Sequence, residues 1–151
     1  MENKAEILNR NRRKMLFGIV MGFGFWHGSQ TLKSFFPEQF TTPGISLFHL
    51  VVIILGLTGW IYFVFYCCRM VKMIAVLKKN IRLNQTLNDE FYQQIRMRSF
   101  YYAFMGVLIT QALLLLFSFF FSVSARSVIN LNILVCVITP IVSFILLDQD
   151  K

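Results

Sequence analysis

The sequence predicts an all-α integral membrane protein with four transmembrane helices, arranged as two hairpins joined by a helical cytoplasmic linker. Hydrophobic residues make up 56% of the 151 residues and the mean hydropathy is +0.61. A soluble domain of this size cannot bury so much apolar surface. Four apolar runs have the length that a bilayer crossing needs, and basic residues gather before the first run and between the second and third.

The first expected span, residues 15–36, is the least hydrophobic of the four. It follows five Lys and Arg in residues 1–14, an arrangement that also describes a secretory signal peptide. Cleavage needs small residues three and one positions before the cut, whereas the candidate sites here hold Trp26, His27 or Gln30. We therefore expect a retained span with a polar outer half, from which Lys33 reaches the headgroups.

The second expected span, residues 46–67, follows a turn rich in proline and glycine and is almost unbroken apolar sequence. Its 22 residues extend roughly 33 Å as a helix, enough for the hydrocarbon core. The linker, residues 68–99, begins as an amphipathic continuation of this helix. We expect its two faces to contact lipid or a partner through Arg69, Lys72, Lys78, Lys79, Arg82, Met70, Ile74, Leu77 and Ile81.

The linker is expected to break at residues 84–86 and to resume as a second helix. Thr86 or Asn88 can cap that helix, and Asp89 and Glu90 then face its positive end. This helix leads into the third span, residues 100–121. A tight outer turn precedes the fourth span, residues 129–147, and Pro140 predicts a kink there.

The charge distribution predicts which side each segment occupies. Residues 1–14 hold five Lys and Arg and residues 68–99 hold seven, whereas the opposite side has only Lys33 and Arg126. Cytoplasmic loops carry the excess of Lys and Arg, so both termini and the linker are expected in the cytoplasm. This indicates a multi-pass protein of the cytoplasmic (inner) membrane.

Small and amide side chains indicate where the spans pack on one another. Glycines four residues apart let two helix backbones approach closely, and amide groups form hydrogen bonds between helices. Packing within the chain is favoured over self-association, although a homo-oligomer remains open. The expected packing residues are Gly18, Gly22, Gly24, Gly28, Gly56, Gly59 and Gln111.

The residues predict no catalytic, cofactor or metal site. No Asp or Glu lies in any expected span, which argues against coupled transport. His27 and His49 lie in the outer halves of the first two spans, but no third ligand accompanies them. The three cysteines show no metal or disulfide spacing. The net charge of +8 flanks apolar runs, so it suits anionic lipid headgroups and not nucleic acid.

The expected function is therefore non-enzymatic. The chain is a small polytopic membrane protein that acts by association, as an accessory, regulatory or immunity-type factor whose linker contacts the bilayer or a membrane protein partner. The alternative is a small transporter, channel or holin-like pore. A quinone- or haem-linked redox subunit is the third possibility.

Overall fold

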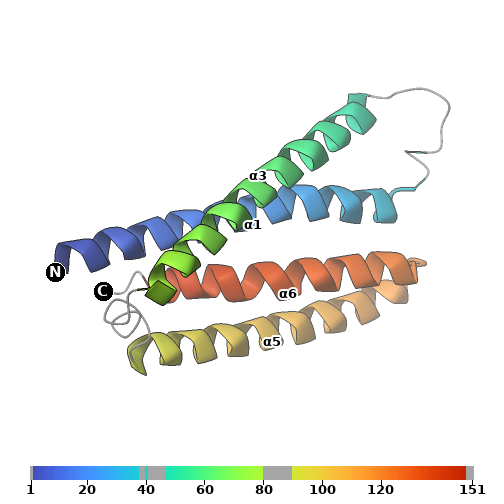
Figure 1. The fold of residues 1–151 in the computed structure, drawn as a ribbon. Coiled ribbons are helices and arrows are strands. Elements are labelled where there is room, and N and C mark those ends of the chain that lie inside the picture. Colours follow the sequence, from blue (N-terminus) through green and yellow to red (C-terminus); the bar gives the residue numbers. More distant parts are fainter. Residues whose placement is uncertain (1, 38–39, 41–46, 80–89, 149–151) are drawn as a thin grey trace.

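The structure, a computed structural model, describes residues 2–37, 40, 47–79 and 90–148. These residues form four long helices, which confirms the all-helical class (Figure 1). They are α1 (Glu2–Phe35), α3 (Leu47–Lys79), α5 (Glu90–Ser118) and α6 (Ala125–Leu147). The expected break at residues 84–86, the caps Thr86 and Asn88, and the linker residues Ile81 and Arg82 lie outside the described part.

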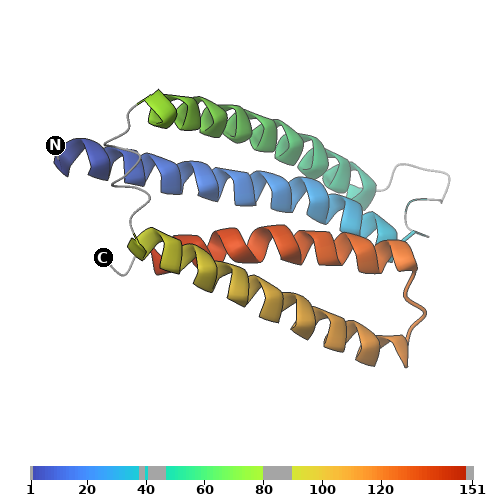
Figure 2. The ribbon, with the colours of Figure 1, turned by 60° about the horizontal axis from the view of Figure 1, so that its bottom comes forward.

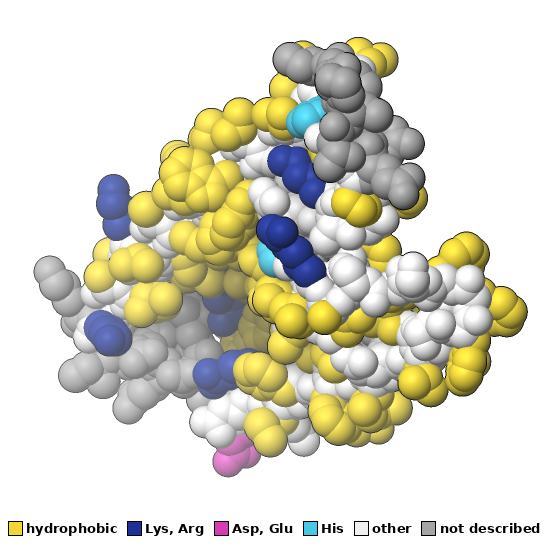
Figure 3. All heavy atoms as spheres, turned by 90° about the vertical axis from the view of Figure 1, so that its right-hand side faces the viewer, with side chains coloured by type: hydrophobic (Ala, Val, Ile, Leu, Met, Phe, Trp, Pro, Cys, Tyr) yellow, Lys and Arg dark blue, Asp and Glu magenta, His cyan; other side chains and the backbone are white. Residues whose placement is uncertain are grey.

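Three of the helices are long and apolar enough to cross a membrane, which indicates a membrane protein. They cover Leu47–Lys78, Tyr92–Ser118 and Ala125–Leu147. Figure 3, seen along the helices from the end where α1 ends and α6 begins, shows hydrophobic side chains over much of the visible surface. Helix α1 does not reach the same hydropathy among the described residues.

The helices extend beyond the apolar runs. Helix α1 begins at Glu2, so the basic segment 1–14 belongs to the same helix as the first apolar run. Helix α3 continues without interruption past residue 67 to Lys79, and α5 begins at Glu90, whose charge faces the positive helix end. Each of these helices continues into polar residues that have good helix propensity. Hydropathy therefore locates the apolar part of each helix but not its ends.

Helix α6 begins four residues earlier than the fourth apolar run. Ser124 is its N-cap, and the Ser124 hydroxyl accepts a hydrogen bond from the Ser127 backbone N–H at 3.1 Å. The Ser127 hydroxyl in turn donates to the backbone carbonyl of Ser34 in α1, at 2.8 Å. The helix runs through Pro140 to Leu147.

The four helices lie side by side in the order α3, α1, α6, α5 (Figures 1 and 2). Helix α1 packs on both α3 and α6, and α6 packs on α5. The two outer helices, α3 and α5, have only slight contact with each other. The amino terminus, the end of α3 and the start of α5 all lie at one end of the molecule.

Helix α1 is the best buried of the four. Met15, Phe23, Ser29 and Thr31 are all buried on it, whereas the apolar windows of α3, α5 and α6 are 11% buried or less. Because α1 lies between two helices, several of its small and polar residues, among them Gly22, Ser29 and Thr31, are buried. The low hydropathy of α1 therefore suits its position, because a helix covered by two others can hold small and polar residues away from lipid.

Helices α1 and α3 cross at glycines, which have no side chain to hold the two backbones apart. A Cβ atom on Gly22 would lie 2.5 Å from the Phe63 backbone nitrogen and 3.1 Å from the Gly59 carbonyl oxygen. A Cβ atom on Gly59 would in turn meet the backbone nitrogen of Trp26. One turn away, Gly18 lies against the ring of Tyr66. The backbones thus touch directly, which is the contact that glycine pairs allow.

Candidate functional site

A buried ion cluster joins the two ends of the chain. Asp148 follows the last turn of α6, and its side chain is only 1% exposed. Its Oδ2 atom lies 3.7 Å from Nη2 of Arg12 and 3.7 Å from Nε of Arg13, both on α1. A carboxylate at a helix C-terminus faces the negative end of the dipole, so these two arginines offset both that repulsion and the burial of the charge.

Two aromatic rings hold the Arg12 guanidinium in place. Its central carbon lies 4.7 Å from the ring centroid of Tyr92 on α5 and 5.0 Å from that of Phe144 on α6. Burial lowers the pKa of Arg12, and the charge of Asp148 opposes this shift. An arginine remains protonated in either case, so the cluster holds a fixed positive charge among three helices.

The aromatic residues belong to a small core at the same end of the molecule. Tyr92 and Ile95 of α5 are buried there, and the partly buried residues packed around them come from the other three helices. Those neighbours are Leu8, Leu77, Phe144 and Leu147. The contact of Leu77 brings the end of α3 close to the start of α5.

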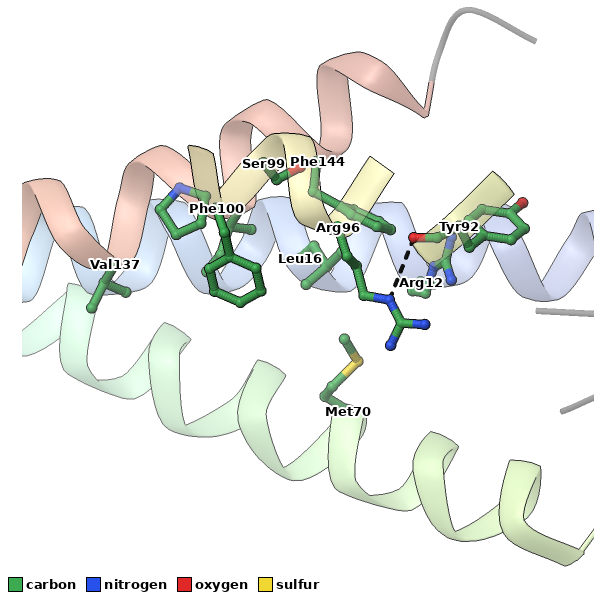
Figure 4. Close-up of a pocket in the computed structure, with 11 residues that line it drawn as sticks. Arg12, Leu16, Met70, Tyr92, Arg96, Ser99, Phe100, Val137 and Phe144 are labelled. Carbon is green, nitrogen blue, oxygen red and sulfur yellow. Dashed lines mark hydrogen bonds between the residues drawn. The ribbon is translucent and has the colours of Figure 1, made fainter. Parts of the chain in front are cut away.

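A cavity of about 490 Å³ opens beside this core, between α3 and α5 (Figure 4). All four helices contribute to its wall, with Arg12 from α1, Met70 from α3, Arg96 and Phe100 from α5, and Pro140 from α6. The outer helices α3 and α5 both line the cavity, and α1 and α6, which lie between them in the row, complete its wall.

The wall of the cavity is charged at one end and apolar elsewhere. Arg96 is exposed, and its Nε donates to the backbone carbonyl of Tyr92 at 3.4 Å. This bond directs the guanidinium across the cavity toward Met70 (Figure 4). Among the lining residues that the structure describes, Arg12 and Arg96 are the charged ones and none is acidic. The site can therefore bind an anionic group beside hydrocarbon.

The described residues offer no set for metal or nucleophilic chemistry here. No three His, Cys, Asp or Glu in this part of the chain could hold a metal ion together. Ser99 lines the cavity, but its hydroxyl donates to the carbonyl of Ile95 within its own helix. The described lining residues are suited to binding an anion beside hydrocarbon.

The apolar residues expected on one face of the linker have different environments in the structure: some pack inside the helix bundle and others are exposed. Met70 lines the cavity and Leu77 packs on the Tyr92 core, whereas Ile74 is 44% exposed. The basic side chains on this part of α3, Arg69, Lys72 and Lys78, are exposed, and Lys79 ends the helix. The described apolar residues therefore do not all share one environment, because the helix turns part of the face toward α5.

The remaining glycines and Gln111 have varied surroundings. A Cβ atom on Gly24 would lie 3.5 Å from Ile138 of α6, and one on Gly56 would lie 2.7 Å from the hydroxyl of Ser29. Gly28 has open space within 4 Å of its Cβ position. Gln111 is exposed on α5. Helix α1 thus presents glycines both to α3 and to α6.

The two histidines have different neighbours. The Nε2 atom of His27 lies 3.0 Å from the backbone oxygen of Asn130 in α6, and its ring stacks on Phe23 at 5.1 Å. His49 lies edge-on to Phe40, with 4.8 Å between ring centroids. His27 thus joins α1 to α6 near the end of the bundle where α1 ends and α6 begins.

Apart from Met70, the sequence did not identify the residues around the cavity as a site. Arg12 and Arg96 count as topology signals in the sequence, and Asp148 stands as a terminal charge beyond the last span. One signal was present: an acid directly after an apolar helix needs a cation, and the basic segment before the first span is on the same side of the predicted topology. Only the helix order brings these groups together.

Comparison with protein-family models, with curated proteins and with solved structures finds no match to the chain.

Proposed function

We propose that the chain is a four-span protein of the cytoplasmic membrane that acts by association, as an accessory, regulatory or immunity-type factor. The central position of α1 supports the fourth span. Three helices have the hydropathy of membrane spans, and α1 lies between two of them. A helix flanked in this way by α3 and α6 crosses the bilayer with them, and its polar residues are sheltered from lipid.

The charge distribution supports the sidedness. Twelve of the fifteen Lys and Arg belong to residues 1–14 and 68–99, while Lys33 and Arg126 belong to the opposite end. The amino terminus, the end of α3 and the start of α5 lie together in Figure 1. The positive-inside rule assigns this end, with both termini, to the cytoplasm.

The exposed basic surface supports association over transport or catalysis. Arg69, Lys72 and Lys78 project from the part of α3 that continues beyond the apolar run. The three apolar helices hold no carboxylate along their spans, and a proton- or cation-coupled transporter generally needs one. A basic surface at this position attracts anionic headgroups or an acidic partner, by roughly 1 kcal/mol per charge at the membrane.

The test is the size of the tagged chain extracted from the producing membranes in mild detergent. We expect a discrete complex larger than the 17.7 kDa chain, weakened when Lys72 and Lys78 are changed to Gln. Changing Lys33 and Arg126 to Gln removes the same charge from the opposite end and leaves the complex intact. Ion leak from vesicles that contain the purified chain would instead favour a small transporter, channel or holin-like pore.

A further inference from the structure

We propose that the cavity between α3 and α5 binds one anionic phospholipid, with its phosphate at Arg96 and an acyl chain against the apolar wall. This inference rests on the proposed membrane location. The cavity holds about 490 Å³ and lies where the basic ends of the helices meet their apolar parts. Headgroups and acyl chains of a bilayer meet at the same level.

The two arginines have different tasks. Arg12 is held by Asp148 and by the rings of Tyr92 and Phe144, so its charge is fixed behind the cavity wall. Arg96 extends across the opening and has the planar donor geometry that binds phosphate oxygens in pairs (Figure 4). A fixed charge behind a direct contact strengthens the attraction without further loss of side-chain freedom.

The apolar wall fits a hydrocarbon chain. Leu16, Phe100, Val137 and Ile141 line the cavity beyond the arginines, on three different helices. Val137 and Phe144 are seven residues apart on α6, so the wall extends along the helix by roughly 10 Å. A soluble anion would leave this surface empty, whereas an acyl chain covers it.

The charge of the lining selects an anionic lipid over a zwitterionic one. Arg12 and Arg96 line the cavity, and none of the described lining residues is acidic, so a choline or ethanolamine group finds no counter-charge among them. Figure 3 shows the hollow between the helices from the outer end, with Lys and Arg side chains visible on its walls. The surrounding bilayer supplies such lipids from the side, through the gap between α3 and α5.

The experiment is native mass spectrometry of the purified full chain in mild detergent, titrated with phosphatidylglycerol or phosphatidylcholine of equal chain length. We expect phosphatidylglycerol to bind about tenfold more tightly, because both lipids offer a phosphate but Arg12 and Arg96 repel the choline cation of phosphatidylcholine. Arg96→Gln should remove most of this preference. Arg98→Gln, at an exposed position of α5 outside the lining, is the matched control and should change it less than about twofold.

A second pair of variants tests the acyl chain. Val137→Trp fills the apolar part of the cavity and should weaken binding without a change of charge, whereas Ile133→Trp at an exposed position of α6 should not. Equal losses in Arg96→Gln and Arg98→Gln would overturn the site in favour of general surface attraction. Displacement of the lipid by inorganic phosphate would overturn the lipid in favour of a free anion.

Alkaline carbonate extraction separates failure of this inference from failure of the proposed function. A chain that stays in the membrane but binds both lipids equally overturns the lipid site alone. A chain that carbonate releases overturns the membrane location, and the lipid site falls with it. Circular dichroism of each variant, together with its elution volume, establishes that the comparison is made between folded proteins.

Discussion

The carboxylate of Asp148, directly after α6, lies 3.7 Å from the guanidinium of Arg12 on α1 and so ties the two ends of the chain together. The contact fastens the end of α6 to α1 at the end of the bundle where the amino terminus lies. It also fixes one wall of the cavity, since Arg12 lines the cavity and Asp148 holds Arg12 from behind.

Asp148→Ala should destabilise the protein, because it leaves two arginine charges at the site without their carboxylate. Removing one partner of a buried pair costs roughly 3–5 kcal/mol, and the 3.7 Å separation places this pair at the lower end. Thermal unfolding in detergent measures the loss. The exposed Arg10→Gln on α1 is the control and should unfold like the wild type.

The double variant Arg12→Met with Asp148→Leu should recover much of that stability. Apolar side chains of similar size avoid the desolvation that the ion pair has to overcome. If the double variant were no more stable than Asp148→Ala, the lost stability would have to come from the cap of α6 and not from the unpaired charge.

Gly22→Ala should weaken the packing of α1 on α3, while Gly28→Ala should not. The new Cβ at position 22 would lie 2.5 Å from the Phe63 backbone, which cannot move aside as a side chain can. Overpacking of this kind costs about 1–3 kcal/mol, whereas Gly28 has open space and gains up to about 1 kcal/mol from helix propensity. Thermal stability and oligomer size in detergent are the measurements. A Gly22→Ala chain that keeps its stability but changes its oligomer size would show that the glycine faces another copy.

Leu77→Glu should loosen the end of α3 more than Ile74→Glu does. Leu77 packs on the core of Tyr92 and Ile95, whereas Ile74 is 44% exposed. Hydrogen exchange across residues 70–79 measures the difference, because amides exchange faster where local packing is lost. Equal exchange in the two variants would mean that both residues lie in the same environment, as expected for a helix on the membrane surface.

The helical class and the approximate positions of the apolar helices follow from the sequence. Runs such as residues 46–67 need no tertiary information, because their hydropathy and length suffice. The helix ends are less predictable. Residues 1–14 continue α1 although they are polar, and the Ser124 cap starts α6 before its apolar run begins.

The cavity could not be predicted from the sequence. It depends on the order of the helices in space, which brings Arg12, Arg96 and Asp148 from distant parts of the chain to one end. Periodicity gives the faces of each helix but not the neighbour of each face. It therefore placed Ile74 and Leu77 together, whereas only Leu77 packs on the core.

The central claim, that α1 crosses the membrane between α3 and α6, is tested most directly by cysteine labelling at its two ends. In a chain without its native cysteines, single cysteines replace Arg10, Pro37, Lys78 or Arg126, and intact cells receive a membrane-impermeant maleimide. We expect labelling at positions 37 and 126 in intact cells, and at positions 10 and 78 only after permeabilisation. Labelling of positions 10 and 37 from the same side would contradict the four-span account.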